Sequence, residues 1–401
     1  MKKIIDFSPP DITDREIEEV VSTLKSGWIT TGPKTKKFEN EIAFYCGAEK
    51  CACLNSATAA LELVLRLFDI KEGDEVITTP YTYAATANVI LHTGAKPVFV
   101  DVSKDDFNID PVGVYDAITD KTKAVIPVDF GGNPCDYDEI FSACEMKKKL
   151  YHASDNAYQS SFDRPVIFSD SAHSFGSAYN GTKTGNIADF TVFSFHAVKN
   201  LTTAEGGAVT FGSLKNKSSA GIYGDLMLYS LHGQSKDALA KSRSGGWKYA
   251  IELPGYKCNM TDIFASLGLV QLSRYDSEII PHRKSICDVY DRYFNSDGRF
   301  IAPRFANKRK RVSYHLYPLR IKGVNEEKRN GIINKMADKG ISCNVHFIPL
   351  PMHPAYKNLG YSIKNYPNAY AMYENEISLP VHSKMDINDA EYVANVLMKL
   401  I

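Results

Sequence analysis

The lysine in the stretch FSFHAVKNLTTAEGG is the first residue whose type and position suggest chemistry. Lys199 follows an aromatic run that is typical of a buried strand, and it precedes a pair of glycines. The plain alternative is a solvated lysine just past a strand end, which is what most lysines are. However, Lys199 leaves the carboxyl end of a predicted strand, where α/β sheets bind their ligands, so we interpret it as a functional amine.

Two further stretches add a carboxylate and an anion site. VIFSDSAH ends an apolar run with Asp170 and His173, and CLNSATAALEL places Asn55, Ser56 and Thr58 at the start of a helix that follows a short strand. The free N–H groups of a helix N-terminus bind phosphate readily. A lysine that can form a Schiff base, a carboxylate that keeps a pyridine nitrogen protonated and an anion cradle are what pyridoxal 5′-phosphate requires. The sequence therefore predicts this cofactor, with the lysine and the aspartate as the catalytic pair.

A parallel sheet is needed to bring these residues together. Apolar runs bounded by Gly, Pro or Asp predict buried strands in EVITTP, KPVFVDV, KAVIPVDF, PVIFSD, FTVFSF and GGAVTFG. The stretch TDREIEEVVSTL begins with capping-box spacing and places Ile17, Val20, Val21 and Leu24 on one helical face. We predict an α/β fold with a mainly parallel mixed sheet between two layers of helices. No G-x-G-x-x-G motif follows a predicted strand, which disfavours a nicotinamide-binding domain.

The chain is predicted to divide into two domains. Residues 1–250 form a large cofactor-binding domain that includes the N-terminal segment, and residues 251–401 form a smaller C-terminal α/β domain. The polar stretch from about residue 214 to 254 indicates a long surface excursion, because its periodicity is weak. Beyond it, SYHLYPLRI and SCNVHFIPL predict strands, and TDIFASLGLVQLSRY and DINDAEYVANVLMKLI predict helices.

Composition excludes several classes of function. The 401 residues are 44% apolar, and Lys+Arg and Asp+Glu each total 47, so nothing indicates a nucleic-acid or anionic-membrane partner. No apolar run has the length of a signal peptide or a membrane span, which predicts a cytoplasmic protein. The eight cysteines include no CxxC pair and are interpreted as reduced thiols, so no metal site is expected.

Several long blocks of the sequence carry a family resemblance. They are SGWITTGPKTKKFENEIAFYCGAEKCACLNSATAALEL, GDEVITTPYTYAATANVILHTGAKPVFVDV, SDSAHSFGSAYNGTKTGNIADFTVFSFHAVKNLTTAEGGAVTF, GYKCNMTDIFASLGLVQL and NVHFIPLPMHPAY. With these blocks the chain resembles the DegT/DnrJ/EryC1/StrS aminotransferases, pyridoxal-phosphate enzymes of fold type I that aminate nucleotide-linked keto sugars. The resemblance implies that Lys199 forms the Schiff base, that Asp170 pairs with the pyridinium nitrogen and that His173 lies beside the phenolic oxygen.

The resemblance also implies further cofactor contacts. Tyr83 corresponds to the aromatic residue that stacks on the ring, Ser56, Ala57 and Thr58 correspond to the phosphate loop, and Ser194 adds a hydroxyl. Each has a simpler alternative. Tyr83 is otherwise a core aromatic, Ser194 otherwise bonds within its strand, and Ser56 and Thr58 are otherwise helix caps, which remains compatible with holding a phosphate.

One segment departs from the family pattern. Many relatives have a G-Y-N-Y-R-type segment whose Asn reaches the phosphate of the neighbouring subunit's cofactor. Here the segment is GYKCN, with Lys257 at the Asn position and Asn259 at the Arg position. Lysine offers the same donor as a point charge, so we predict a homodimer with shared active sites. The alternative is a solvent-facing lysine.

The resemblance implies a ping-pong cycle with L-glutamate as amino donor and a nucleotide-linked keto sugar as acceptor, for cell-surface polysaccharide or glycan biosynthesis. A 4-keto sugar of the 6-deoxy or pentose type, linked to UDP, is favoured. Trp28, Trp247, His315 and His346 lie in segments that resemble the lining of the sugar cleft, although both histidines are otherwise structural. The rival functions are a sugar dehydratase, whose relatives have histidine in place of the lysine, and a regulatory protein that binds the cofactor without turnover.

Overall fold

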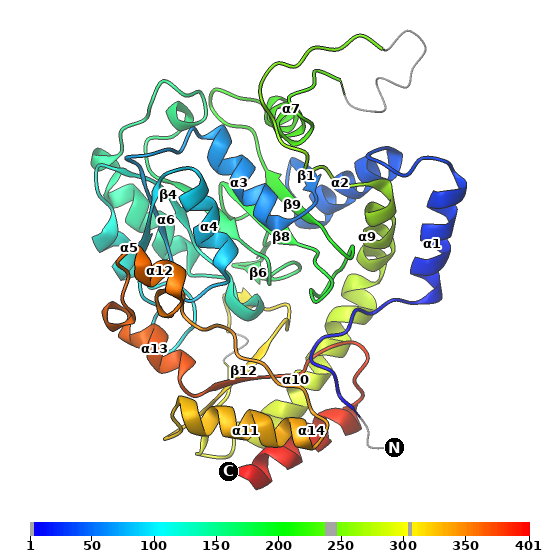
Figure 1. Cartoon of the computed structure of the whole chain (residues 1–401), viewed down its shortest axis with the longest axis vertical. Coiled ribbons are helices and arrows are strands. Elements are labelled where there is room, and N and C mark those ends of the chain that lie inside the picture. Colours follow the sequence, from blue (N-terminus) through cyan, green and yellow to red (C-terminus); the bar gives the residue numbers. More distant parts are fainter. Residues whose placement is uncertain (1–3, 237–246, 304–306) are drawn as a thin grey trace.

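The computed structural model of the protein describes residues 4–236, 247–303 and 307–401 (Figure 1). The described helices are α1 (Asp14–Lys25), α2 (Pro33–Cys46), α3 (Ala57–Leu67), α4 (Ala84–His92), α5 (Pro111–Ala117), α6 (Tyr137–Met146), α7 (Ser219–Ser230), α9 (Asp262–Arg274), α10 (Ile280–Phe294), α11 (Glu326–Asp338), α12 (Pro354–Asn358), α13 (Pro367–Tyr373) and α14 (Ile387–Leu400). The described strands are β1 (Lys50–Leu54), β2 (Glu75–Thr78), β3 (Lys96–Phe99), β4 (Thr122–Ile126), β5 (Val166–Asp170), β6 (Ala178–Tyr179), β7 (Thr182–Lys183), β8 (Phe190–Ser194), β9 (Gly207–Phe211), β10 (Phe300–Ile301), β11 (Lys310–Arg311), β12 (Tyr317–Ile321) and β13 (Glu376–Leu379). None of these helices is both long and apolar enough to cross a bilayer.

A seven-stranded sheet in the order β1-β9-β8-β5-β4-β2-β3 forms the centre of the molecule. Only β9 runs antiparallel to its neighbours, with Gly207 opposite both Leu54 of β1 and Ser194 of β8. The six apolar runs predicted as strands all lie in this sheet. The α/β fold with a mainly parallel mixed sheet is therefore confirmed.

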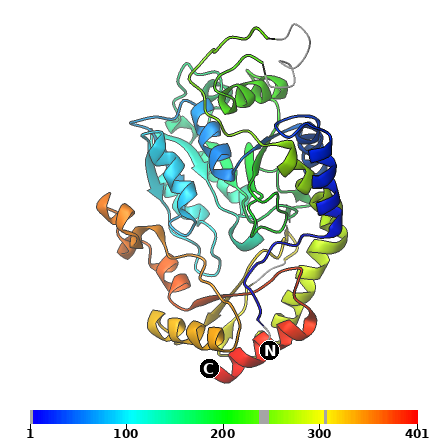
Figure 2. The ribbon, with the colours of Figure 1, turned by 45° about the vertical axis from the view of Figure 1, so that its right-hand side comes forward.

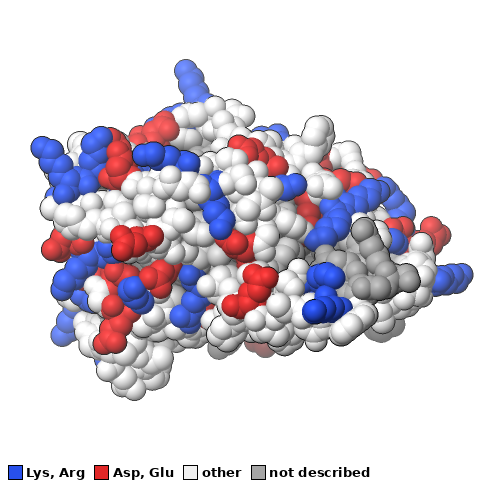
Figure 3. All heavy atoms as spheres, turned by 90° about the horizontal axis from the view of Figure 1, so that it is seen from above, with Lys and Arg blue, Asp and Glu red and all other residues white. Residues whose placement is uncertain are grey.

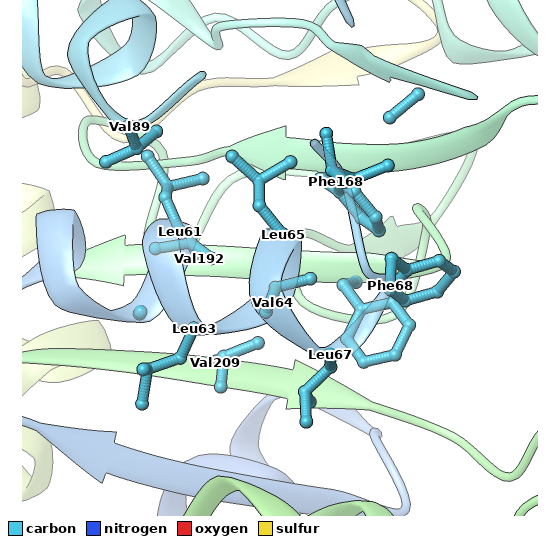
Figure 4. Close-up of a cluster of buried hydrophobic side chains, with 14 of the residues drawn as sticks. Leu61, Leu63, Val64, Leu65, Leu67, Phe68, Val89, Phe168, Val192 and Val209 are labelled. Atoms are coloured by element: carbon cyan, nitrogen blue, oxygen red, sulfur yellow. The ribbon is translucent and has the colours of Figure 1, made fainter. Parts of the chain in front are cut away.

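Helices cover both faces of the sheet, as the alternation of apolar residues requires. Val76 of β2 faces a cluster with α3, α4 and α7, whereas its neighbour Ile77 faces a cluster with α5 and α6. Figure 4 shows α3 pressing Leu61, Leu65 and other apolar side chains onto the strands. This packing anchors α3, so that its first turn is held at the edge of the sheet where the parallel strands end.

A second hydrophobic cluster joins the C-terminal elements. The antiparallel sheet β10-β12-β13 packs with α10, α11 and α14, and Ile5 of the N-terminal segment belongs to the same cluster. Figure 2 shows this segment running from α1 to the C-terminal helices. Helix α9 instead packs with α2, through Leu269 and Phe38. The predicted division at residues 250 and 251 stays a prediction.

Two predictions about individual segments are wrong. SCNVHFIPL forms no strand and has only an isolated bridge between Asn344 and Ser378, because the backbone N–H of His346 is taken by the Glu376 side chain at 3.1 Å. The polar stretch from about 214 to 254 contains helix α7, which Ser218 caps by accepting from the Gly221 N–H at 3.2 Å. Residues 237–246 of that stretch lie outside the described residues.

Helix α1 is amphipathic as predicted, but it faces the wrong way for a core helix. Ile17 and Leu24 are each 53% exposed, whereas Glu16 is fully buried. The Glu16 carboxylate accepts from the Arg274 guanidinium of α9 at 2.7 Å, and a buried charge needs such a partner. The apolar row of α1 is thus left uncovered by the described part of this chain. Elsewhere, acidic and basic side chains are interspersed over the face seen in Figure 3.

Candidate active site

A cavity of about 500 Å³ lies at the carboxyl ends of the parallel strands. The large sheet and its helices contribute most of its walls, and the segments around His315 and His346 close it from the side of the small sheet. Among its lining residues are most of those predicted from the sequence, namely Ser56, Ala57, Thr58, Tyr83, Asp170, His173, Ser194, Lys199, His315 and His346. Side chains from six separate stretches of the chain therefore converge on one space.

Lys199 and Asp170 are the charged pair of this cavity. Burial lowers the pKa of the Lys199 amine to about 8, against the opposing effect of the Asp170 charge. No hydrogen bond or ion pair within the described chain involves this amine, so it is free to react. The Asp170 carboxylate is buried, and it accepts from the Thr86 hydroxyl at 2.8 Å and from the Ala172 N–H at 3.2 Å. Burial also raises the pKa of Asp170, so a cation is its natural ligand.

His173 has a defined tautomer. Its Nδ1 lies 3.2 Å from the Gly131 backbone nitrogen, which can only donate, so Nδ1 accepts and Nε2 carries the proton. Burial, with the charge of Lys199 beside it, keeps the pKa of His173 well below its usual value. His173 is therefore a neutral hydrogen-bond donor in the cavity wall.

His315 has the opposite tautomer. The Asn200 amide is oriented by donating to the Ser313 carbonyl at 2.7 Å, which leaves its oxygen 2.8 Å from His315 Nδ1. His315 Nδ1 must therefore donate. The His315 ring lies beside that of His173, with 4.4 Å between centroids. Burial likewise keeps the pKa of His315 well below its usual value.

The start of α3 fits a phosphate group. Ser56 caps the helix by accepting from the Ala59 N–H at 3.1 Å, whereas the first N–H groups, those of Ala57 and Thr58, have no intrahelical partner and line the cavity. Gly207 allows the close approach of this turn to β9, because a Cβ there would lie 2.3 Å from the Ala57 nitrogen. A free amine, a buried carboxylate and open N–H groups around one cavity fit pyridoxal 5′-phosphate.

The remaining predicted residues lie differently. Tyr83 is 69% exposed and is therefore not a core aromatic, and the Ser194 hydroxyl accepts from the His196 N–H at 3.4 Å. Lys257 is exposed, and Asn259 is buried and donates to the Thr31 hydroxyl at 2.6 Å. Lys257 and Asn259 do not line the cavity of their own chain.

The two tryptophans also lie outside the cavity lining. Trp28 donates to the Thr31 carbonyl at 3.1 Å, and Trp247 is 77% exposed at the edge of the described residues. Their predicted contact with a sugar substrate stays a prediction.

Sequence reasoning missed three features of the cavity. Thr86, which holds Asp170, was detectable as a hydroxyl just inside the helix that follows EVITTP. Phe7 and Ser8 of the N-terminal segment line the cavity, and no local pattern places them there. Behind His346, Ser378 and Glu376 form a buried polar pair within a strand. The signal for that pair was an acidic residue inside an otherwise apolar run.

Comparison with known proteins agrees with this geometry. The sequence model of the DegT/DnrJ/EryC1/StrS aminotransferase family matches residues 10–398. The chain belongs to this family. The putative sugar aminotransferase Spr1654 from Streptococcus pneumoniae, solved in its PMP form, is 51% identical with a TM-score of 0.95, covering 99% of this chain and 98% of that one. Its PLP form has a TM-score of 0.94.

Two curated relatives are also similar over their full lengths. The spore coat polysaccharide biosynthesis protein SpsC of Bacillus subtilis is 39% identical over 98% of this chain and 96% of its own. The UDP-4-amino-4,6-dideoxy-N-acetyl-beta-L-altrosamine transaminase of Campylobacter jejuni is 33% identical over 99% of this chain and 98% of its own. Family membership confirms the predicted type I fold, the aminotransferase class and pyridoxal 5′-phosphate as the cofactor.

Proposed function

We propose that this aminotransferase moves the amino group of L-glutamate to a nucleotide-linked keto sugar. The observation that carries the proposal is the convergence of Lys199, Asp170 and the first turn of α3 on one cavity. When bound, pyridoxal 5′-phosphate supplies an electron sink for the pair released at the α carbon of the amino acid. The residues of the chain supply the binding and the proton transfers.

Lys199 is the proton carrier in this proposal. With its pKa lowered to about 8 by burial, a useful fraction of the amine is neutral near pH 7. The neutral amine takes the proton from the α carbon of glutamate in the first half-reaction. It would deliver that proton to the reacting carbon of the cofactor and so become neutral again. In the second half-reaction it would move a proton from that carbon to the sugar carbon, which gives a ping-pong cycle.

Asp170 and His173 would hold the ring of the cofactor. The Asp170 carboxylate is held by Thr86 at 2.8 Å, and a protonated ring nitrogen would be the cation that keeps it ionised despite its burial. His173, whose Nε2 carries the proton, would donate to the phenolic oxygen. Tyr83 would stack on the ring, and Ser56, the two N–H groups that follow it and Ser194 would bind the phosphate.

A UDP-linked 4-keto sugar of the 6-deoxy or pentose type is the proposed acceptor. Support comes from the Campylobacter jejuni relative, whose name specifies a UDP-linked 4-amino-4,6-dideoxy sugar. The SpsC relative supports a role in surface polysaccharide synthesis. His315 and His346 are the proposed sugar contacts of this chain.

A homodimer with shared active sites completes the proposal. The uncovered apolar row of α1, together with Phe44 of α2, which is 90% exposed, offers a surface for a second copy. Lys257 is exposed, does not line the cavity of its own chain and donates to the Asn259 side chain. Its proposed target is the phosphate bound by the partner subunit.

The test combines a spectrum with a substrate panel. Adding L-glutamate to the holoenzyme should convert the cofactor from its aldehyde-derived absorbance to that of the pyridoxamine form, and a regulatory binder would show no conversion. UDP-, dTDP- and GDP-linked keto sugars are then added and the products scored by mass spectrometry. An amino sugar supports the proposal, a deoxygenated sugar without nitrogen indicates a dehydratase, and no product with any sugar refutes it.

A further inference from the structure

Behind His346, a chain of hydrogen bonds leads from the cavity into the small sheet. His346 Nδ1 lies 2.9 Å from the Ser378 hydroxyl, and that hydroxyl lies 2.5 Å from Glu376 Oε1. Glu376 Oε2 accepts from the His346 backbone N–H at 3.1 Å. Glu376 and Ser378 are two residues apart on β13, so their side chains point to the same face. The loop stays in register because Asn344 and Ser378 exchange backbone hydrogen bonds at 3.1 and 2.8 Å.

Only one end of this series of hydrogen bonds reaches the cavity. His346 lines the cavity, whereas Ser378 and Glu376 do not, and both are fully buried. Since Nδ1 of His346 is bonded to Ser378, the other ring nitrogen, Nε2, is the one available to a ligand. No hydrogen-bond partner of Nε2 is present in the described part of the chain. The imidazole therefore connects the cavity to a buried carboxyl group.

The hydrogen-bonded series of His346, Ser378 and Glu376 can hold its protons in two arrangements. Ser378 has a single hydroxyl hydrogen, so it can donate to Glu376 while accepting from His346 Nδ1–H, or accept from a protonated Glu376 while donating to His346 Nδ1. In the first arrangement Nε2 is a bare acceptor, and in the second Nε2 carries the proton. The two arrangements differ by one proton, which enters or leaves at Nε2 and resides on Glu376.

The surroundings of Glu376 favour its protonated form near neutrality. No side-chain nitrogen of a described Lys, Arg or His lies within 4.0 Å of its carboxyl oxygens, since Arg329 donates to the Tyr373 and Glu376 carbonyls and Arg320 to Asn375 and Ala371. Burial raises the pKa of Glu376 to about 8, although the hydrogen bonds and the two arginines oppose this. The other titratable groups near the carboxyl are Tyr81 and Cys343, both of which burial keeps neutral.

His346 itself cannot hold the extra proton. Burial and the nearby charge of Lys199 lower its pKa to about 3, and the neutral rings of His173 and His315 lie in the same wall. The imidazole can therefore give up the Nε2 proton only while it receives another at Nδ1. Such coupled transfer is what the Ser378 hydroxyl and the Glu376 carboxyl permit.

We propose that Glu376 is a proton reserve for the cavity and that Ser378 and His346 deliver its proton to the oxygen of the substrate carbonyl. When the keto sugar is aminated, a C–N bond forms and the carbonyl oxygen leaves as water. The attacking amino nitrogen gives one proton to the oxygen and Nε2–H gives the other, while Ser378 gives one to Nδ1, and Glu376 gives one to Ser378 and becomes a carboxylate. In the glutamate half-reaction a water molecule is consumed, and the proton it releases returns along the same path. The catalytic part of this proposal rests on the proposed function, whereas the relay itself does not.

The relay is tested first without turnover. Histidine labelled with ¹⁵N in the full-length apoprotein reports which ring nitrogen carries the proton, and His346→Gln assigns the signal. We expect His346 to stay neutral between about pH 6 and about pH 10, and to change from the Nε2–H to the Nδ1–H tautomer as Glu376 ionises. A single tautomer over this range, or an imidazolium, would overturn the proposal.

Two variants and a matched control locate the proton. In Glu376→Gln the amide donates to Ser378 as the neutral acid does, so His346 should remain the Nε2–H tautomer at every pH. Glu374→Gln changes the nearby partly exposed carboxyl and should leave the tautomer change intact. If Glu376→Gln does not fold, Ser378→Ala, which removes the middle of the relay, should also abolish the change. If the tautomer change of His346 persists at the same pH in folded Glu376→Gln or Ser378→Ala, the proposal is overturned.

Kinetics then separate the relay from the proposed function. In single turnovers of the pyridoxamine form with the keto sugar, the wild-type rate should fall as pH rises through the pKa of Glu376, because the reserve is then empty. Glu376→Gln should be slower by about a hundredfold and lack this limb, with cofactor affinity unchanged. A wild-type-like rate in Glu376→Gln overturns the catalytic role. Failure of every sugar to react refutes the proposed function instead and leaves the tautomer change standing.

Discussion

Replacing Gly207 by alanine should weaken the binding of the cofactor phosphate. A Cβ at Gly207 would lie 2.3 Å from the Ala57 nitrogen and 2.4 Å from the Ser56 carbonyl carbon, whereas ordinary contact begins at 3.4 Å. One backbone must therefore move by about 1 Å, and no side chain can rotate to relieve the contact. Strand β9 is bonded on both sides within the sheet, so the first turn of α3 is the part that shifts. Because a displacement of about 1 Å costs up to about a hundredfold in a preorganised site, we expect a ten- to hundredfold loss of affinity.

The assay titrates the apoenzyme with pyridoxal 5′-phosphate and, separately, with pyridoxal, which lacks the phosphate. Gly207→Ala should lower the affinity for pyridoxal 5′-phosphate and leave the affinity for pyridoxal nearly unchanged. Gly224→Ala in α7 is the matched control, because nothing lies within 4 Å of its Cβ position, and it should bind both ligands as the wild type does. An unchanged affinity for pyridoxal 5′-phosphate in Gly207→Ala would refute the phosphate site, and an equal loss for both ligands would refute its specificity.

Three further predictions address the amine and the core. Lys199→Ala should abolish turnover with L-glutamate while leaving the circular dichroism spectrum unchanged, and substantial residual transamination contradicts its role. Capture of pyridoxal 5′-phosphate by the wild-type apoenzyme should accelerate as pH rises and level off above the Lys199 pKa of about 8, because only the neutral amine reacts; a rate independent of pH across that value argues against it. Leu65→Ala should lower the free energy of unfolding by about 2–5 kcal/mol in urea titrations, since Leu65 is fully buried, whereas the exposed Leu359→Ala should change it by less than about 0.5 kcal/mol.

The sheet and the charged residues of the cavity were predictable because each rests on a local pattern. Apolar runs that end in Asp170 or precede Lys199 identify strands and place reactive groups at their carboxyl ends. Parallel strands then bring those ends together whatever the intervening sequence. The same reasoning fails at SCNVHFIPL. Its residues are typical of a strand, but they do not form one because the side chain of Glu376 binds the backbone N–H of His346.

What could not be predicted depends on contacts between distant segments. The periodicity of TDREIEEVVSTL reveals an apolar face but not what covers it, and the structure buries Glu16 against Arg274 while Ile17 stays exposed. Likewise, Glu376 in the run EISLP resembles an ordinary charged residue at a strand edge. Only the structure shows that His346 lies beside it. Pairings of this kind link residues far apart in sequence, and a single sequence carries no signal for them.

The charge of the cavity argues for a contribution from a second subunit. The described lining holds one lysine and no arginine, and burial keeps the pKa of three of its histidines, His173, His315 and His346, well below the usual value. The proposed ligands carry a phosphate, two glutamate carboxylates and a diphosphate, which ordinarily require cations. Lys257 is exposed and does not line that cavity in its own chain, where its amine donates to the Asn259 side chain. We propose it as the cation that serves the neighbouring cavity.

Mixing an inactive variant with an impaired one tests this sharing directly. Lys199→Ala lacks the reacting amine, and Lys257→Ala should lose at least about tenfold in activity if its charge serves the partner's phosphate. In a heterodimer of the two, one site carries both defects and the other carries neither, because each site takes Lys199 from one subunit and Lys257 from its neighbour. After exchange in equal amounts, half of the dimers are mixed and half of their sites are intact, so activity should recover to about a quarter of the wild type. Activity that stays at the mean of the two parent variants would show that each subunit completes its own site and that Lys257 acts, if at all, within its own chain.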